Sequence, residues 1–360
     1  MKNIPDIIEL RPNRVWRSYF GGRMLDREEG KEDLKDSHFP EDWIASTTKA
    51  VNQGREDYSK EGISLVTLNG QDHLLSDLFK AYPNVLLGPL HHLKYGSDTG
   101  FLMKFLDSSI RLHIQVHPTI SFSRNHLNSN HGKTEAYIIL KVREEEKDPY
   151  IYFGFQHQIH KEALKKAVER QDIGTLTGCF EKIRISPGDV FIVPGGMPHA
   201  IGPGVLMIEI MEPTDFVARL EFERGGYVLP EAARFMDRGI DFAMDMISFE
   251  EIPVEKIKED YFCKPRILEE QKGGYEAILI DSQQTICFSV HRLNIDKKYR
   301  KRSGSFYVGI VTEGEGVVKT ENQELKVKKG SRFLIPFVAE FVDYIADNGQ
   351  LEIVLAFPPI

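Results

Sequence analysis

This chain carries Gln115-Val116-His117, Lys133-Thr134-Glu135 and Pro194-Gly195-Gly196-Met197-Pro198-His199, and these three segments decide its fold class. Each lies on or beside a stretch that is typical of a β-strand. Strand side chains alternate between faces, so residues two apart point the same way. Two imidazoles, one carboxylate and one amide oxygen suit Zn²⁺ or a similar divalent ion. The residues that could close on one metal are Gln115, His117, Glu135 and His199.

The segment around Gln115 alternates strictly in polarity, with a period of two. Leu112, Ile114 and Val116 are apolar. The positions between and beside them are polar: Arg111, His113, Gln115 and His117. A face with two histidines and an arginine is costly to bury and unusual on a purely structural surface. We therefore expect this face to line a functional site; the alternative is an edge strand with a solvated outer face.

The composition is that of an ordinary globular protein. The chain has 360 residues, of which 41% are hydrophobic and 28% charged, so it can form two domains or one large one. Its formal net charge of −8 argues against nucleic acid as a partner. A local cluster of lysine and arginine could still hold an anionic substrate.

Cysteine use and hydropathy indicate the compartment. The three cysteines, Cys179, Cys263 and Cys287, show no CxxC spacing, which favours a reducing environment over a disulfide framework. The N-terminal residues lack the apolar core of a signal peptide. No stretch approaches the ~18 uninterrupted apolar residues of a membrane span. We expect a cytoplasmic protein without a membrane partner.

Short predicted strands and a few helices divide the chain into three parts. The strands are expected at 101–105, 112–117, 136–142, 151–155, 180–185, 190–193 and 205–210. The helices are expected at 72–79, 160–170 and 230–236. We predict a metal-bearing barrel with N-terminal strands and a short helical insertion at 1–229. A helical connection follows at 230–261, and a C-terminal barrel without metal ligands at 262–360.

An internal repeat supports two barrels. Ile185-Ser186-Pro187-Gly188 resembles Val327-Lys328-Lys329-Gly330, and Phe191 and Pro194 then match Phe333 and Pro336. Runs of short antiparallel strands with Gly/Pro turns are the pattern of a jelly roll. His199 stands 11 residues after Gly188, and the same interval from Gly330 reaches Phe341. The repeat therefore predicts one metal site in the first copy and none in the second.

Several segments, taken in order, resemble the type I mannose-6-phosphate isomerases of the cupin superfamily. The resemblance covers most of residues 15–225 and, more loosely, the C-terminal part. The first segments are residues 100–107 and 114–118, followed by Gly132-Lys133-Thr134-Glu135. Residues 187–202, Glu209-Ile210 and Asp215-Phe216-Val217-Ala218-Arg219 come next, and Phe20-Gly21-Gly22 and Glu41-Asp42-Trp43 are weaker matches.

The resemblance implies a mainly β fold of two cupin-type jelly-roll barrels, with a few helices inserted in them and between them. It implies one Zn²⁺ per chain, held by Gln115, His117, Glu135 and His199, and the interconversion of mannose 6-phosphate and fructose 6-phosphate. Arg219 corresponds to the family's catalytic arginine and Lys133 to its active-site lysine. His113 stands where the family usually has a serine that contributes to phosphate binding, so we take His113, Lys133 and Arg219 as substrate-binding candidates.

The expected chemistry is aldose–ketose isomerisation through an enediol. Negative charge develops on two sugar oxygens, where a bound metal and the Arg219 guanidinium can stabilise it. Glu209, Lys133 and His113 are candidates for the base that moves the proton between carbons. Glu209 could instead hold Arg219 by an ion pair, and Asp215 could orient Arg219 or cap a turn.

Three other functions compete with this one. An iron-dependent cupin dioxygenase usually has two closely spaced histidines and a glutamate soon after, whereas here Gln115 stands first and Glu135 follows His117 by 18 residues. A non-catalytic sugar-binding cupin is expected to have lost Arg219 or Lys133, and both are present. An isomerase of a different or unphosphorylated sugar is the alternative that His113 favours.

Overall fold

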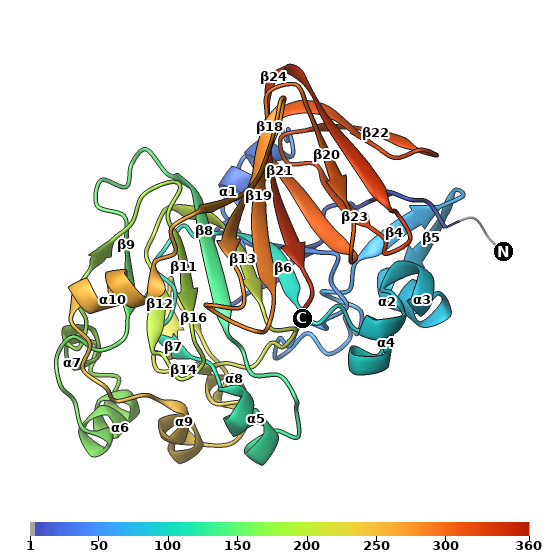
Figure 1. Cartoon of the computed structure of the whole chain (residues 1–360). Helices are drawn as coiled ribbons and strands as arrows, with labels where there is room; N and C mark the ends of the chain where they lie inside the picture. The colour runs from blue at the N-terminus through green and yellow to red at the C-terminus, as the bar shows by residue number, and fades with distance from the viewer. Residues whose placement is uncertain (1–3, 360) are drawn as a thin grey trace.

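In the computed structural model, which describes residues 4–359, the chain folds mainly into antiparallel β-sheets (Figure 1). The first large sheet has six strands in the order β11-β8-β13-β6-β3-β2. They are β2 (Arg14–Val15), β3 (Glu41–Ile44), β6 (Leu102–Asp107), β8 (Glu135–Val142), β11 (Val190–Val193) and β13 (Val205–Met211). Every residue of β6 and β13 is buried, because both faces of this sheet are covered.

A second sheet covers one face of the first. Its order is β10-β9-β12-β7-β14. Its strands are β7 (Gln115–Val116), β9 (Tyr150–Phe153), β10 (Ile183–Arg184), β12 (His199–Ile201) and β14 (Ala218–Arg219). Phe153 of β9 packs inward with Tyr137 and Phe191 of the first sheet. Tyr150 and Tyr152 alternate with it and face the outer helices α6 (Lys161–Arg170), α7 (Ile173–Gly178) and α9 (Ile240–Met246).

A third sheet is built from the C-terminal part of the chain. Its order is β1-β23-β21-β24-β19-β18-β17, with β20 paired to β24 and β22 to β21. The strands are β1 (Ile8–Glu9), β17 (Arg266–Gln271), β18 (Gly274–Ile280), β19 (Ser289–Ile295), β20 (Lys298–Arg302), β21 (Tyr307–Lys319), β22 (Glu324–Lys328), β23 (Arg332–Ile335) and β24 (Phe341–Phe357). One face encloses its own core around Tyr299, Phe333 and Tyr344.

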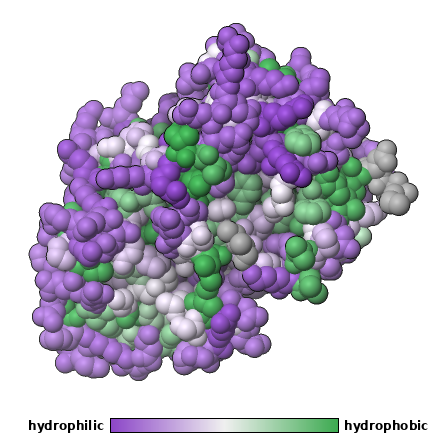
Figure 2. All heavy atoms as spheres, viewed as in Figure 1, coloured by the Kyte–Doolittle hydropathy of each residue, from purple (hydrophilic) through white to green (hydrophobic). Residues whose placement is uncertain are grey.

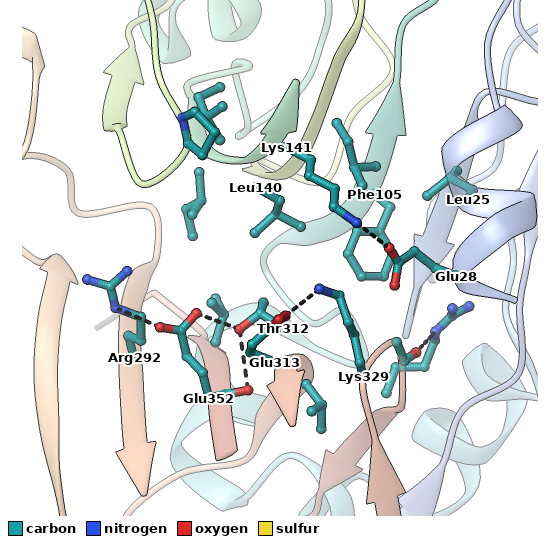
Figure 3. Close-up of a pocket in the computed structure, with 18 of the residues that line it drawn as sticks. Leu25, Glu28, Phe105, Leu140, Lys141, Arg292, Thr312, Glu313, Lys329 and Glu352 are labelled. Carbon is teal, nitrogen blue, oxygen red and sulfur yellow. Dashed lines mark hydrogen bonds and ion pairs between the residues drawn. The ribbon is translucent and has the colours of Figure 1, made fainter. Parts of the chain in front are cut away.

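The other face of the third sheet packs against the first sheet. Phe105 and Ile208 of the first sheet share one apolar cluster with Ile310 and Val354 of the third. A cavity of about 420 Å³ remains within this interface (Figure 3). Ion pairs of Lys141 with Glu28 and of Lys329 with Glu313 lie at its edge, so these charges are neutralised within the protein.

The two large sheets have the same strand order. Reading β11-β8-β13-β6-β3-β2 against β23-β21-β24-β19-β18-β17 matches each strand of one sheet with a strand of the other. Phe191 of β11 and Phe333 of β23, the matched residues of the sequence repeat, are both fully buried. The repeat is therefore confirmed. We call strands β2 to β14 the first repeat and strands β17 to β24 the second repeat.

Each repeat gains an additional strand partner from outside its own strands. β1, near the N-terminus, pairs with β23, so that Glu9 lies opposite Phe333. Phe262 forms a bridge to Phe191, and the Cys263 N–H donates to the Val190 carbonyl at 2.7 Å. The mainly β class is confirmed, whereas the described strand orders are open and do not establish two closed barrels.

Two predicted elements differ from the structure for local reasons. The predicted helix at 72–79 begins later, as α2 (Leu75–Ala81), because Asn69 and Gly70 both adopt positive φ and turn β5 (Gln71–Leu74) back onto β4 (Leu65–Leu68). The predicted strand at 112–117 is reduced to β7. There the Glu221 carboxylate, instead of a neighbouring strand, accepts the Ile114 N–H at 2.7 Å.

The remaining elements are short. The predicted helices at 160–170 and 230–236 are confirmed as α6 and α8. No helix in the described part of the chain is long and apolar enough to cross a membrane. The elements not yet named are α1 (Arg23–Glu28), α3 (Pro83–Leu86), α4 (Pro89–Tyr95), α5 (Ile120–His126), β15 (Glu223–Arg224), β16 (Tyr227–Val228), α8 (Glu231–Arg234) and α10 (Val254–Tyr261).

The matched phenylalanines provide a test of the repeat. Phe191→Ala and Phe333→Ala should each lower the free energy of unfolding by about 3–5 kcal/mol, because each removes a fully buried ring and leaves a cavity. Phe341→Ala is the matched control, since that ring is 43% exposed, and should change stability by less than about 1 kcal/mol. Urea unfolding of the three variants measures this. A loss confined to one of the two buried positions would contradict equivalent packing.

Candidate functional site

The four predicted metal ligands meet where the first two sheets come together. Register places Gln115, the first residue of β7, directly opposite His199, the first residue of β12. Glu135 is the first residue of β8, and His117 follows β7. Ligand atoms of His117, Glu135 and His199 all lie within 4.8 Å of one another, and all three residues are buried.

The donor atoms of this cluster converge on one point. His117 Nε2 lies 3.1 Å from one Glu135 carboxylate oxygen, and His199 Nε2 lies 3.3 Å from the other. The Gln115 amide lies 3.3 Å from His199 Nε2 through the atom assigned as nitrogen. Rotating that amide by half a turn would present its oxygen, because nitrogen and oxygen positions in an amide are an assignment.

Both histidines are held in the tautomer that a metal requires. His117 Nδ1 donates to the Phe216 carbonyl at 2.7 Å, and His199 Nδ1 donates to the Met197 carbonyl at 2.9 Å. These bonds leave each Nε2 lone pair facing the cluster, the arrangement that orients histidine ligands in metal sites. Burial lowers the pKa of His117 to about 3, so this imidazole is neutral near pH 7.

The Glu135 carboxylate stays charged although it is buried. Burial alone would raise its pKa, but the groups around it, with the Lys133 ammonium among them, hold the pKa well below its ordinary value. The Lys133 ammonium lies 3.0 Å from the carboxylate, and the Tyr137 hydroxyl donates to it. Two imidazoles, an ionised carboxylate and an amide are the donor set of a zinc-type site, so these residues fit such an ion.

A network of alternating charges runs beside the cluster. Lys104 Nζ lies 3.2 Å from Glu209 and 3.4 Å from Glu41, and Arg17 lies 3.5 Å from Glu41 and 2.9 Å from Asp215. Burial and the nearby Glu135 raise the pKa of Glu209 to about 8, although Lys104 opposes this rise. Glu209 can therefore take up or release a proton near neutral pH.

Arg219 does not form the ion pair with Glu209 that we considered, nor one with Asp215. Glu209 pairs with Lys104, and Asp215 accepts two hydrogen bonds from Arg17. Arg219 donates to the Ala233 carbonyl at 2.9 Å, and within residues 4–359 no carboxylate lies at ion-pair distance from it. Burial and Arg17 lower its pKa to about 10, which still leaves the guanidinium charged at neutral pH. No carboxylate within residues 4–359 neutralises this guanidinium, so its charge remains available in the hollow that it lines.

His113 lies in the site, but its pKa is too low for the base that titrates near neutral pH, which we had considered. Burial and the neighbouring arginines, Arg219 first, lower its pKa to about 2. Its Nε2 atom is buried and has no hydrogen-bond partner in the described structure. Arg111, expected on the same face, instead forms a buried ion pair with Glu221 at 2.6 Å. The segment also lies inside a sheet, since β7 has β12 and β14 as neighbours, which excludes the edge-strand alternative.

The hollow between these residues is small, about 20 Å³. It is lined by Gln115, Lys133, Glu135, Glu209, Arg219 and His113, together with Arg17, Tyr19, Glu41 and Lys104. This space suits an ion or one water molecule, because a water needs at least ~10–15 Å³. A larger ligand would therefore have to displace side chains, and Lys133 and Arg219, which line the hollow, have flexible stems.

Sequence reasoning missed Arg17 and Lys104, and had only a weak family match for Glu41. One signal was available. Lys104 interrupts the apolar run Phe101-Leu102-Met103-Lys104-Phe105-Leu106, and Glu209 interrupts Val205 to Met211 in the same way. A charged residue inside a fully buried strand needs a partner of opposite charge. Antiparallel pairing of β6 with β13 places Lys104 opposite Glu209.

Comparisons with known proteins agree with this fold. The family model for the cupin domain of mannose-6-phosphate isomerase matches residues 283–357. Mannose-6-phosphate isomerase ManA of Bacillus subtilis is 28% identical over 277 residues, covering 75% of this chain and 80% of that protein. Mannose-6-phosphate isomerase of Streptococcus mutans is 25% identical over 292 residues, covering 79% of this chain and 84% of that protein.

Solved structures extend the likeness over the whole chain. The crystal structure of mannose 6-phosphate isomerase from Bacillus subtilis superposes with a TM-score of 0.75 at 20% identity, covering 98% of this chain and 99% of that one. A zinc-bound mannose 6-phosphate isomerase gives a TM-score of 0.72 at 15% identity over 99% of this chain and 100% of that one. The family-model match indicates a cupin domain at residues 283–357. Over its whole length the chain has the fold of these mannose 6-phosphate isomerase structures, and its sequence is similar to those of the two bacterial relatives.

The buried Arg17–Asp215 pair predicts a pH-dependent stability. Asp215→Asn should lower the free energy of unfolding at pH 7 by about 3 kcal/mol, because it leaves a buried guanidinium unpaired. Burial alone would raise the Asp215 pKa, but Arg17 holds it below the ordinary value of 3.8. The wild-type carboxylate therefore contributes stability above pH 3.8 and loses it as the pH falls through the lowered pKa.

Urea unfolding at several pH values measures this effect. The difference between wild type and Asp215→Asn should shrink below pH 3.8. Asp77→Asn is the control, because Asp77 is 64% exposed and its contact with Lys80 is 3.7 Å long, so we expect a change below about 0.5 kcal/mol. A difference that does not depend on pH would contradict the assigned role of the carboxylate charge.

Proposed function

We propose that this protein is a zinc-dependent aldose–ketose isomerase that interconverts mannose 6-phosphate and fructose 6-phosphate. One observation carries the proposal: His117, Glu135 and His199 converge beside a charged arginine, and the two histidines are hydrogen-bonded through Nδ1, which leaves Nε2 for the metal. The relatives named mannose-6-phosphate isomerase support the substrate, and the similar zinc-bound structure supports the metal.

In this proposal Gln115, His117, Glu135 and His199 hold one Zn²⁺ per chain. The ion, when bound, supplies a Lewis acid that stabilises negative charge on the sugar oxygens. The hydrogen bonds from His117 to Phe216 and from His199 to Met197 fix the two rings before any ligand arrives. The protein therefore does not have to reorganise these ligands during the reaction.

Arg219 is proposed as the residue that holds the enediolate. Its guanidinium remains charged, lines the hollow and, among residues 4–359, donates to the Ala233 carbonyl alone. Donors that are free of a carboxylate partner can be directed at charge that develops during the reaction. Lys133 contacts Glu135 and lines the same hollow as Arg219. It is proposed to bind substrate and to assist proton transfer.

Glu209 is the proposed proton carrier. It lines the hollow, and its raised pKa of about 8 places its ionisation near neutral pH. A base of that strength can remove a proton from one sugar carbon and return it to the next. His113 is proposed as a substrate-binding residue instead, because a neutral imidazole with a free Nε2 can exchange one hydrogen bond with a sugar or phosphate oxygen.

Organisation and location complete the proposal. We propose that each repeat is a cupin-type jelly-roll barrel, with a helical connection at 230–261 between a metal-bearing part at 1–229 and a metal-free part at 262–360. β1 nevertheless belongs to the third sheet. The substrate is proposed to be the one functional partner, with no role for nucleic acid or membrane. The unpaired cysteines Cys179, Cys263 and Cys287 fit a reducing, cytoplasmic setting.

A substrate screen tests the function. Purified protein should convert mannose 6-phosphate to fructose 6-phosphate, lose this activity on chelation and recover it with Zn²⁺. Elemental analysis should give one zinc per chain, and His199→Ala should lose zinc and activity together. Turnover of free mannose without turnover of the phosphate would favour the alternative that His113 suggests, an isomerase of an unphosphorylated sugar. No turnover of any aldose by zinc-loaded protein would favour a non-catalytic sugar-binding cupin.

Arg219→Ala should act mainly on the transition state. We expect kcat to fall by roughly 10²–10³, the scale for loss of one donor to a developing oxyanion, with a smaller change in KM. Steady-state kinetics measure both, and a melting curve should show a folded protein. Arg184→Ala is the control, because Arg184 is 69% exposed and pairs only with Asp148. A folded Arg219→Ala variant with wild-type kcat would remove this residue from the mechanism.

A further inference from the structure

Strand register shows which residues of the second repeat occupy the positions of the metal cluster. Arg302 of β20 lies opposite Phe341 of β24, as Gln115 lies opposite His199. Tyr307 of β21 lies opposite Ile335, as Glu135 lies opposite Val193. Gly304, two residues after Arg302, takes the position of His117. The ligand positions of the second repeat thus carry Arg302, Gly304, Tyr307 and Phe341.

The second repeat nevertheless keeps a buried charged centre. Glu276 lies opposite Leu293, as Glu41 lies opposite Leu106 in the first repeat. Glu276 contacts His291 Nδ1 at 2.5 Å, Lys301 Nζ at 2.6 Å and the Tyr299 hydroxyl at 3.2 Å. Burial would raise the pKa of Glu276, but His291 and Lys301 lower it to about 2. The carboxylate therefore fixes the His291 ring from one side.

The His291 side chain also lines a cavity. Its Nδ1 is held by Glu276, and its ring packs against Phe357 with 4.7 Å between centroids. Nε2 lies on the other edge of the ring, and the side chain, 15% exposed, lines a cavity of about 530 Å³. The cavity is lined by residues of α4 and by residues at the end of the second repeat, and in Figure 1 α4 lies near the C-terminal end of the chain.

Two differences from the first repeat explain why this cavity is open. Gly304 has no side chain where the first repeat has His117, and a Cβ built on it would meet no atom within 4 Å. The segment from His117 to Glu135, which includes α5, has a much shorter counterpart from Gly304 to Tyr307. The second repeat therefore lacks both the ligand side chain and the covering segment.

The cavity lining indicates the class of ligand. Phe337, Phe357 and Pro359 present flat apolar surfaces, and exposed apolar side chains of α4 extend the rim (Figure 2). Ser289, Ser305 and His291 supply groups that hydrogen-bond best with a partner that is both donor and acceptor, which a hydroxyl is. Besides histidines the lining has one acid, Asp281, and one base, Lys94, so it has no excess charge to select an anion.

We propose that the second repeat binds a neutral saccharide in this cavity, through His291 and the two serine hydroxyls, with a sugar ring against Phe357. The volume fits one or two sugar rings, since ligand pockets typically measure ~300–1,000 Å³. The site is separate from the metal cluster and does not rest on the isomerase activity.

A pair of matched glycine variants tests this proposal. Gly304→Leu adds a bulky side chain at the cavity wall without backbone strain, because Gly304 lines the cavity, lies outside the left-handed region and has open space around it. Gly178→Leu is the control, since Gly178 is equally open but lies in α7 of the first repeat. Titration calorimetry and ligand-observed NMR with mannose, glucose and cellobiose should show saturable binding to wild type with a Kd of about 1 mM.

The expected pattern across variants is specific. Gly304→Leu should weaken binding at least ~tenfold, a change of about 1.4 kcal/mol, while its melting temperature and mannose 6-phosphate turnover match wild type. Gly178→Leu should bind like wild type, and His291→Gln should bind more weakly. His199→Ala should retain saccharide binding, because the cavity lies in the other repeat. Absence of saturable binding of all three sugars to wild type, or equal binding by Gly304→Leu, would overturn the proposal. Loss in His199→Ala with retention in Gly304→Leu would assign the sugar to the metal cluster instead.

Discussion

The buried Glu135 carboxylate is the constraint on which the first repeat depends. A charge in the protein interior costs several kcal/mol unless other groups compensate it. Lys133, Tyr137 and the two histidines surround this carboxylate, and each comes from a strand or strand end that must be in register for the contact to form. The same charge that makes the cluster suitable for a cation therefore also specifies how β7, β8 and β12 meet.

The charge network beside the cluster extends this principle to the N-terminal strands. Glu209, Lys104, Glu41, Arg17 and Asp215 alternate in sign, and all have side chains that are at most 6% exposed. Each charge is tolerated because its neighbours are opposite, so the network favours one arrangement of β3, β6 and β13. Arg219 stands at the end of this network without a carboxylate partner in the described structure, and this leaves its guanidinium available to a substrate.

Much of the site could be predicted from sequence because its residues lie in short, ordered motifs. The predicted ligands lie at or next to the ends of strands: Gln115, His117, Glu135 and His199. The sequence repeat, which includes Phe191 and Phe333, is confirmed by the matching strand orders of the two large sheets. What could not be predicted depends on long-range pairing. Arg17 contacts Asp215 across 198 residues, and Glu221 replaces a strand neighbour at Ile114 across 107 residues. Local alternation could not distinguish Arg111, which pairs with Glu221, from His113, whose pKa is lowered by burial and then by Arg219. A closed barrel requires the first and last strands of a sheet to pair with each other, and the described sheets do not show such a pair.

The pairing of β1 with β23 has a consequence for biosynthesis. Ile8 leaves the ribosome 326 residues (334 − 8) before its partner Leu334. At the usual ~5–20 residues per second, the N-terminal strand waits tens of seconds for its place in the sheet. During that interval Ile7, Ile8 and Leu10, all buried in the finished protein, are exposed and attractive to chaperones. β1 is thus translated long before the strand with which it pairs.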